Sequence, residues 1–227
     1  WVLRDVSFHI RPGETIAFVG PTGAGKSTII NLLSRFYENQ RGTIRIDGRD
    51  ISSIPLESLR KHIGIVLQDV FLFSDSLRNN VTLYDKDVVE STLEAAATAV
   101  GADEFIRQLP EGWNQNVRER GAMLSVGQRQ LIAFMRAYVV SPTILVLDEA
   151  TSSIDSESEL LIQRATARIT EGRTSLLVAH RLSTIRNAKR ILVMDEGRIV
   201  QSGSHESLVA VDGLYRELSQ SQHDEIE

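Results

Sequence analysis

The stretch Thr15–Tyr37, TIAFVGPTGAGKSTIINLLSRFY, decides the fold of this chain. It opens with a short apolar run, Ile16–Val19, which predicts a buried strand. It closes with apolar residues at the three-and-four spacing of one helix face, namely Ile29, Ile30, Leu32, Leu33 and Phe36. A strand followed at once by a helix, with a glycine-rich loop between them, indicates a unit of an α/β protein.

The loop between strand and helix fits the phosphate-binding pattern G-x-x-x-x-G-K-[ST]. Glycines let backbone N–H groups turn toward phosphate oxygens, and the helix N-terminus adds a partial positive charge. Lys26 adds a full charge, and the Ser27 hydroxyl is placed to bind a magnesium ion between two phosphates. The predicted phosphate-binding residues are Gly20, Pro21, Thr22, Gly23, Ala24, Gly25, Lys26, Ser27 and Thr28. A chance glycine-rich turn is the alternative, and the flanking strand and helix count against it.

Composition and charge restrict the class of function. The 227 residues can form one substantial core with a smaller subdomain attached. A net charge of −5 argues against a broad nucleic-acid surface, and the absence of cysteine excludes disulfides and thiolate metal sites. No apolar run reaches the ~20 residues that cross a bilayer, and no signal peptide opens the chain. We therefore expect a soluble fragment, cut from a longer protein, whose membrane role comes through a partner.

Wholly apolar strands alternate with helical segments along the chain. Besides the central strand, apolar strands are predicted at 63–67, 143–147 and 174–179. Such strands indicate a parallel sheet covered on both faces. Alternating segments predict half-exposed hairpin strands at 6–10, 42–48 and 190–200. The expected fold is α/β, a P-loop NTPase core with a mostly parallel sheet, an antiparallel β portion and an inserted helical subdomain.

A run of helices interrupts this rhythm. Helices are predicted at 87–100, starting from a cap at Asp87 with Glu90, and at 103–109 and 125–140. Residues 69–85 are expected to form a loop whose apolar Phe71, Leu72 and Phe73 are either in the core or on a partner surface. Within one domain, 1–227, we expect a catalytic core at about 1–85 and 141–227 and a helical subdomain at about 86–140.

Polar side chains follow three apolar strands, as the phosphate loop follows the first. Gln68 follows one strand, Asp148 and Glu149 end another, and His180 follows a third. The carboxyl ends of parallel strands share one edge of a sheet, so we expect these groups to converge on the phosphates. Each alone has an ordinary explanation as a loop, capping or solvent-facing residue. Together they predict triphosphate hydrolysis coupled to a conformational change.

Charge and chemistry suggest a role for each group. Asp148 is expected to hold Mg²⁺ directly or through water, and Glu149 to polarise the attacking water. His180 is expected to hydrogen-bond the terminal phosphate or that water, and Gln68 suits a ligand to Mg²⁺ or water. The predicted catalytic residues are Glu149, His180 and Gln68, and the predicted metal ligands are Ser27, Gln68 and Asp148.

The segment Leu124–Gln128, LSVGQ, begins a helix with the capping-box spacing of Ser125 and Gln128. Ser125 and the first amides of that helix form an anion site. From the residues alone, an ordinary capped helix explains the segment equally well.

Taken together, the motifs resemble, nearly end to end, the nucleotide-binding domain of an ABC transporter of the exporter type. They occur in the family's order: GPTGAGKST at 20–28, Gln68, LSVGQ at 124–128, ILVLDE at 144–149, Ser153-Ile154-Asp155 and His180 in VAHRLST. The resemblance implies that ATP and Mg²⁺ are bound and that ATP hydrolysis drives export through transmembrane domains. It also implies a head-to-tail dimer with a second nucleotide-binding domain, from the same or a different chain. In that dimer Ser125 and Gly127, with Gln128 in the same set, would contact the γ-phosphate of the other subunit, and Asp155 would lie across the interface.

The resemblance also implies where the domain works. Transmembrane domains, fused upstream in the intact protein, would be gripped by Gln68, the loop after it and Glu119-Arg120-Gly121. The expected location is the cytoplasmic face of the cell membrane, within an integral membrane complex and without a nucleic-acid partner. The adenine-stacking aromatic residue of the family should lie a few residues before Trp1.

One residue departs from the family pattern. Val126 stands where the family has the first glycine of LSGGQ, and its β-branched side chain restricts the backbone near the phosphate. Similar substitutions occur in exporters built from two different halves. With Glu149 intact, this chain would be the half that keeps the catalytic carboxylate and lends its altered motif to the weaker site.

Other classes explain less of the sequence. The main alternative is a soluble ABC-type ATPase that acts on nucleic acid or ribosomes, which usually carries a coiled-coil insertion or a second domain and a basic surface. A small-metabolite kinase would leave Leu124–Gln128 and His180 unexplained. A domain that binds ATP without hydrolysing it is disfavoured by Glu149.

Overall fold

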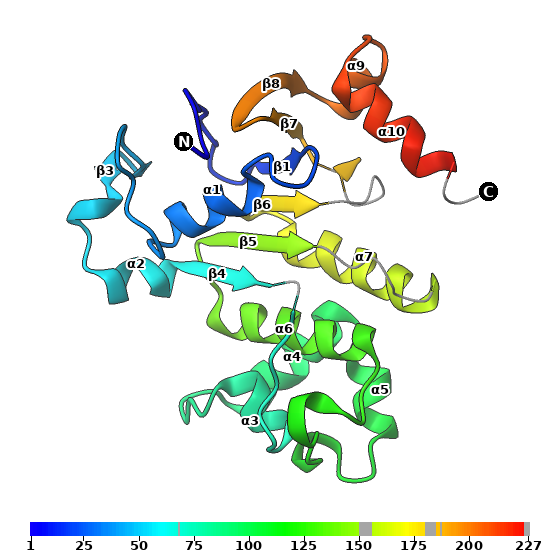
Figure 1. Cartoon of the computed structure of the whole chain (residues 1–227). Helices are drawn as coiled ribbons and strands as arrows, with labels where there is room; N and C mark the ends of the chain where they lie inside the picture. The colour runs from blue at the N-terminus through cyan, green and yellow to red at the C-terminus, as the bar shows by residue number, and fades with distance from the viewer. Residues whose placement is uncertain (68, 150–155, 180–184, 187, 225–227) are drawn as a thin grey trace. The chain divides into compact units, whose positions relative to one another are not determined.

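The computed structural model describes residues 1–67, 69–149, 156–179, 185–186 and 188–224, in two compact units (Figure 1). The first unit comprises Trp1–Ile65, Thr143–Ala150 and Gly172–Glu227, and the second comprises Val66–Pro142 and Thr151–Glu171. The second unit is larger than the helical subdomain expected at about 86–140. It begins earlier and also includes the later helix α7 (Ser156–Thr170), which packs against two other helices of that unit.

A six-stranded mixed sheet is the centre of the first unit, with strand order β4-β5-β6-β1-β7-β8. Its strands are β1 (Thr15–Val19), β4 (Ile63–Val66), β5 (Ile144–Glu149), β6 (Thr174–Ala179), β7 (Arg190–Asp195) and β8 (Arg198–Gly203). β1 pairs in parallel with β6 and β7, β5 pairs in parallel with β6, and β8 returns antiparallel to β7. The predicted mostly parallel sheet with an antiparallel portion is therefore confirmed.

The register of the parallel strands brings their carboxyl ends level. Phe18 of β1 and Asp148 of β5 both lie opposite Val178 of β6, so the three residues form one row across the sheet. The loop that follows β1 and the end of β5 therefore share one edge. Ligands of open α/β sheets bind at this edge.

The core of the first unit explains why these strands are so apolar. Ile16, Ala17 and Phe18 have no exposed surface, as expected for a central strand that is covered on both faces. Helix α1 (Lys26–Leu33) contributes Ile29 and Ile30 to the same core. The helix ends before Phe36, whose side chain is exposed, so the predicted helical face was one turn too long.

The residues before β1 do not form the predicted strand at 6–10. Val6 and Ile10 pack against the core, and the Phe8 ring meets the Phe18 ring edge-on at 5.3 Å between centroids. The alternating pattern at 6–10 thus reflects one-sided packing of an extended segment, without a strand partner among the described residues.

A small ribbon follows α1. β2 (Arg45–Ile46) pairs antiparallel with β3 (Arg49–Asp50) through a turn at Asp47 and Gly48, both of which have positive φ. Such a pair of left-handed residues matches the twist of a tight hairpin, as the Asp-Gly signal predicts. A short 3₁₀ turn (Ile51–Ser53) and helix α2 (Leu56–His62) then lead into β4.

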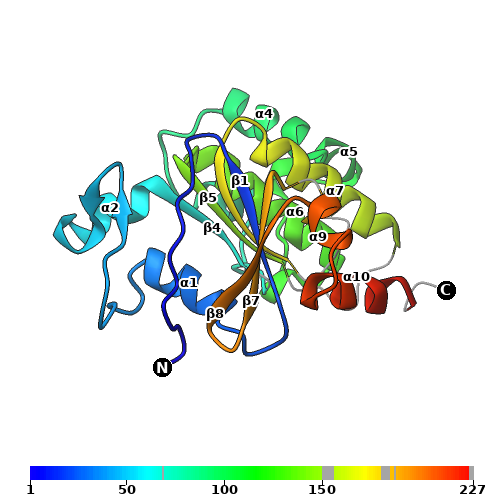
Figure 2. The same cartoon turned by 90° about the horizontal axis from the view of Figure 1, so that it is seen from above.

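The first unit closes with two helices after β8, α9 (His205–Val209) and α10 (Leu214–Asp224). Seen from above in Figure 2, the strands fan out with the usual twist of a parallel sheet, and α9 lies beside β8. Among the helices that the structure describes, none is long and apolar enough to cross a membrane.

The second unit is helical. Its described helices are α3 (Leu77–Thr82), α4 (Glu90–Val100), α5 (Asp103–Gln108), α6 (Val126–Val140) and α7, with 3₁₀ turns at Gly112–Asn114 and Glu119–Gly121. Helix α6 packs against α3, α4 and α7 and is the centre of this unit. Its buried face includes Leu131, Ile132, Phe134 and Met135.

Two helix predictions in this unit were wrong. Residues 69–85 are not all loop, because α3 forms there: Ser76 caps it by accepting from the Asn79 N–H at 3.1 Å, and Leu77 and Val81 are buried. Asparagines and a threonine, which form helices poorly, hide its period in the sequence. Helix α4 begins after Val89, with no side-chain cap, rather than at Asp87.

Candidate functional site

The loop between β1 and α1 has a backbone that only glycine can supply at its first position. Gly20 has a φ of +148°, and a Cβ at this residue would lie 2.0 Å from the Met194 carbonyl oxygen of β7. Gly23 and Gly25 also have positive φ, +84° and +99°. The two glycines that the phosphate-binding pattern requires therefore have structural reasons here. Gly20 allows the close approach of the loop to β7, and Gly25 combines a positive φ with a site where a Cβ would lie 2.7 Å from Leu3 Cδ2.

The N-terminus of α1 has no side-chain acceptor for its first amides. Gly25 is the N-cap residue, no side chain caps the helix, and no acidic residue lies in the first turn. The first N–H groups of any helix lack intrahelical acceptors, and the helix dipole adds positive charge there. The end of α1 thus has the donors and the field that bind phosphate oxygens.

Lys26 lies inside the loop. Its side chain is 5% exposed, and its ammonium donates to the carbonyl oxygens of Gly20 at 2.7 Å and Pro21 at 2.9 Å. Burial lowers the pKa of Lys26, and the nearby Asp148 charge opposes that shift. A buried ammonium that is bonded to neutral carbonyls is stabilised further when an anion binds beside it.

Two oxygen donors that suit magnesium lie near this loop. Ser27 is exposed on the first turn of α1, and Asp148 is half-buried near the end of β5. The described residues include no group of three or more His, Cys, Asp or Glu that could hold a metal alone. Mg²⁺ normally uses one or two protein oxygens together with phosphate and water, so a hydroxyl and one carboxylate fit it.

The remaining predicted catalytic residues are placed only in part. Glu149 ends β5, and its backbone pairs with that of Ala179, the last residue of β6. Gln68 and His180 lie outside the described residues, as does Ser153-Ile154-Asp155. The strands before Gln68 and His180, β4 and β6, both belong to the sheet, as predicted.

The segment Leu124–Gln128 forms the capped helix start that its spacing predicts. The Gln128 N–H donates to Ser125 Oγ at 3.1 Å, and the Ser125 N–H donates to Gln128 Oε1 at 3.0 Å. Val126 is the first residue of α6 and is 44% exposed, so a helical backbone suits its β-branched side chain. The capping box is confirmed.

Gly127 has a role that the sequence did not reveal. It is buried in α6, and a Cβ there would lie 2.6 Å from the Ser158 Cβ of α7. Close packing of two helices therefore requires glycine at this position, independently of any ligand. No local pattern marks this contact, because Ser158 is far along the chain.

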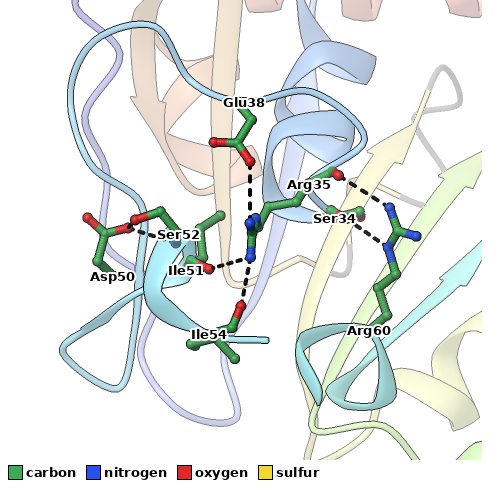
Figure 3. Close-up of polar contacts among 8 residues, drawn as sticks. All are labelled: Ser34, Arg35, Glu38, Asp50, Ile51, Ser52, Ile54 and Arg60. Atoms are coloured by element: carbon green, nitrogen blue, oxygen red, sulfur yellow. Dashed lines mark hydrogen bonds and ion pairs between the residues drawn. The ribbon is translucent and has the colours of Figure 1, made fainter. Parts of the chain in front are cut away.

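Two arginines that sequence reasoning missed hold the far end of α1 (Figure 3). Arg35 donates to the carbonyls of Ile51 at 3.0 Å and Ile54 at 2.7 Å, next to α2. Arg60 of α2 donates back to the carbonyls of Ser34 at 3.3 Å and Arg35 at 3.2 Å. These bonds position α1, whose other end carries the phosphate loop. Their acceptors are backbone carbonyls, which leave no signal in a sequence.

The loop before α3 presents an aromatic surface on the second unit. Phe71, Phe73 and Tyr84 are 58%, 42% and 54% exposed, and adjacent rings meet edge-on with centroids 5.2 Å and 6.2 Å apart. Leu72 between the two phenylalanines is buried. Leu72 is therefore in the core, as the first predicted alternative has it, whereas its two neighbours are exposed and their partner surface stays a prediction. We call Phe71, Phe73 and Tyr84 the aromatic patch.

Fold and site together define a class of protein. A parallel sheet, a phosphate loop after its central strand, an uncapped helix and an acidic residue at the same edge are the parts of a P-loop nucleoside triphosphatase. A family model described as ABC transporter matches residues 3–152. The chain belongs to the ABC transporter family, and its predicted resemblance to the ATPase domain of the exporter type is confirmed.

Individual relatives agree with this assignment. The chain is 49% identical over 221 residues to the Bacillus subtilis protein named "Probable multidrug resistance ABC transporter ATP-binding/permease protein YheH", covering 97% of this chain and 33% of the relative. It is 49% identical over 223 residues to the ATP-dependent lipid A-core flippase of Alkalilimnicola ehrlichii, covering 98% of this chain and 38% of the relative. A solved bacterial Atm1-family ABC exporter with ATP bound superposes with a TM-score of 0.89 at 42% identity, covering 97% of this chain and 39% of that one. The chain thus spans roughly a third of the length of these relatives.

Proposed function

We propose that the chain binds Mg²⁺-ATP through residues 20–28 and hydrolyses it to drive export through associated transmembrane domains. The observation that carries this proposal is the buried Lys26 at the uncapped N-terminus of α1, bonded to two loop carbonyls. Such an arrangement offers a full charge, free amide donors and a dipole to one phosphate chain.

Magnesium would be held by Ser27 and Asp148 with Gln68, and when bound it neutralises charge on the phosphate oxygens. Glu149, next to Asp148 at the end of β5, would take a proton from the attacking water. His180 would hydrogen-bond the terminal phosphate or that water. Support for these roles comes from the strand register. Phe18 of β1 and Asp148 of β5 both lie opposite Val178 of β6, so the carboxyl ends of these three strands lie at one edge of the sheet.

A second nucleotide-binding domain would complete the site. We infer a head-to-tail dimer in which Ser125, Gly127 and Gln128 contact the γ-phosphate that the partner domain holds. Support comes from α6, a 15-residue helix whose N-terminus is exposed at Ser125. The first and second units would then act as the catalytic core and the helical subdomain.

The transmembrane partner is inferred from the relatives and from the surface. One relative is named an ATP-binding/permease protein, and this chain covers only a third of it, so transmembrane domains would account for the rest. The aromatic patch, with Glu119-Arg120-Gly121, would contact those domains, because exposed aromatic clusters mark interaction sites. The domain would then work at the cytoplasmic face of the cell membrane.

Val126 suggests a dimer of unlike halves. A valine in place of the family's glycine adds a side chain at the first residue of α6, where the partner's phosphate would approach. We propose that this weakens one of the two ATP sites, while Glu149 keeps this chain's own site active. Equal hydrolysis at both sites of a purified homodimer would contradict that idea.

The proposal is tested by measuring phosphate release from Mg²⁺-ATP. Lys26→Ala is expected to lower ATP affinity by at least about tenfold, because the only buried cation found in the loop is removed. Glu149→Gln is expected to keep ATP affinity but to lose at least 100-fold in turnover, which is the lower range for a general base (about 10²–10⁴). Arg168→Gln, at an exposed bond to the Thr98 carbonyl, is the matched control.

Two products or responses would overturn the proposal. A phosphorylated acceptor in place of free phosphate would indicate a kinase. Stimulation of phosphate release by nucleic acid would favour the soluble ABC-type ATPase that acts on nucleic acid or ribosomes.

A further inference from the structure

Helix α6 carries, about 16 Å from its N-terminal cap, an arginine that bonds to the loop behind the aromatic patch. Arg136 donates from Nη1 to the Phe71 carbonyl at 2.8 Å, from Nε to the Asn80 carbonyl at 2.6 Å and from Nη2 to Asn80 Oδ1 at 3.1 Å. One side chain therefore ties α6 both to α3 and to the exposed loop.

Asn80 extends this contact across the loop. The side chain has no exposed surface, and its Oδ1 also accepts from the Phe73 N–H at 2.8 Å. Its amide donates to the carbonyls of Phe73 and Ser76, each at 3.0 Å. Both amide hydrogens and the oxygen of Asn80 are therefore used, so its rotamer and the path of the loop are fixed together.

The chemistry of these bonds differs from that of an ion pair. The three acceptors of these Arg136 bonds are two backbone carbonyls and one amide oxygen, and burial lowers the pKa of its guanidinium. A partly buried guanidinium that bonds to three neutral oxygens keeps all three bonds only while the oxygens stay at the spacing of its planar fork of N–H groups. Movement of α6 past α3 would therefore break several bonds at once or carry the loop with it.

We propose that Arg136 and Asn80, here named the Arg136–Asn80 clamp, couple the N-terminus of α6 to the aromatic patch. Displacement of α6 when Ser125 meets nucleotide would shift Phe71 and Phe73 through the clamp. Arg136 is a positioning residue in this scheme and touches no nucleotide. The inference rests on the proposed function, since it needs nucleotide to bind at the start of α6.

The test measures amide hydrogen exchange in the 227-residue chain that carries Glu149→Gln, with and without saturating Mg²⁺-ATP. Protection at Ser125–Gln128 reports nucleotide contact at α6, and protection of the Phe73 N–H reports the loop. We expect ATP to slow exchange by about fivefold or more at both places, the lower range of coupling between sites. Adding Arg136→Gln should leave the response at Ser125–Gln128 and abolish it at Phe73.

A merely structural role would give a different result. Loss of stability alone would raise exchange at Phe73 with and without ATP and leave the ATP-dependent ratio unchanged, and that result would overturn the inference. Arg168→Gln, which removes an arginine bond to a carbonyl elsewhere in the second unit, should retain the parent response. Where Arg136→Gln does not fold, Arg136→Lys decides: one ammonium cannot reach all three acceptors, so a reduced response supports the clamp and a full one overturns it.

The Glu149→Gln chain with Arg136 intact distinguishes failure of the clamp from failure of the proposed nucleotide contact. Protection at Ser125–Gln128 without protection at Phe73 overturns the clamp and leaves the proposed dimer intact. Absence of protection at Ser125–Gln128 overturns the proposed nucleotide contact of α6, and the clamp with it.

Discussion

Single residues at this site are fixed by the groups that they contact within the protein. Lys26 is buried and satisfies its ammonium on the carbonyls of Gly20 and Pro21, so the loop is already folded around the charge that phosphate needs. Gly20 permits this because any side chain would collide with β7. Preorganisation of this kind lowers the entropy that ligand binding would otherwise cost.

A second buried titratable residue lies outside the nucleotide site. Tyr215 of α10 is 1% exposed, and its hydroxyl is 2.8 Å from Nδ1 of His205, at the start of α9. Arg186 donates to the other ring nitrogen of His205 at 3.1 Å, which leaves Nδ1 as the donor to Tyr215. Burial raises the pKa of Tyr215 from 10.0 to about 12, while Arg186 opposes and Glu206 adds to the shift.

This raised pKa predicts a pH-dependent stability. The folded pKa lies above the unfolded one, so the stabilisation is complete below pH 10 and is lost as pH rises from 10.0 to about 12. We expect the urea midpoint of the chain to fall across that window. Tyr215→Phe keeps the ring but cannot ionise, so its midpoint should fall less steeply. Parallel curves for the two proteins would remove Tyr215 from this role.

At the scale of elements, the N-termini of two helices and the end of β5 carry the candidate ligand contacts. Helix α6 carries the capping box at one end and Arg136 further along, and its middle packs on α3, α4 and α7. In the first unit, Arg35 and Arg60 fasten the end of α1 that lies away from the phosphate loop. Both helices are therefore fixed by contacts away from their N-termini, and the N-terminus of α1 has no side-chain cap.

Gly127 offers a direct test of how closely α6 packs on α7. Gly127→Ala would place a methyl group 2.6 Å from the Ser158 Cβ, so we expect a loss of about 1–3 kcal/mol in the free energy of unfolding, measured in urea. Val126→Ala, at the exposed neighbouring position, should change stability by less than about 0.5 kcal/mol.

A second substitution tells a packing clash from other causes. Ser158→Gly removes the Cβ that the alanine would meet, so the double variant should lose less stability than the two single changes combined. Strict additivity would show that Gly127 is needed for a reason other than Ser158.

At the scale of the whole molecule, the predicted nucleotide contacts are divided between the two units. The phosphate loop and Asp148 belong to the first unit, and Ser125, Gly127 and Gln128 belong to the second. In the proposed dimer, each ATP would be held by the first unit of one domain and the second unit of its partner. Assembly would then depend on ATP.

The solution mass of Glu149→Gln tests this assembly. We expect a shift from monomer to dimer when saturating Mg²⁺-ATP is added, because bound ATP would join the two domains and hydrolysis would no longer release them. Val126→Gly should strengthen this self-association, since it removes a side chain that is 44% exposed at the start of α6. A chain that binds ATP yet stays monomeric would contradict this self-association and would favour the dimer of unlike halves that Val126 suggests.

Local sequence predicted most of the fold for identifiable reasons. The phosphate loop, the apolar strands and the capping box of Ser125 depend on neighbouring residues, so they are visible as patterns. The residues at 6–10 and the helix α3 were misread for the opposite reason. Phe8 packs edge-on against Phe18 without a strand partner, and Leu77 and Val81 form a helix because their side chains are buried.

The sequence by itself determined the class of site, because a charge, glycines and a hydroxyl at fixed spacing leave few alternatives. Only the tertiary structure decided which residues hold that site in place. The Met194 carbonyl leaves no room for a Cβ at Gly20, and Ser158 leaves none at Gly127. Arg136 donates to the carbonyls of Phe71 and Asn80. All of these contacts join residues that are distant in the chain. Most of these contacts involve backbone carbonyls or a single Cβ. Every residue type has a backbone carbonyl, and whether a Cβ fits depends on distances in space, so neither produces a pattern in the sequence.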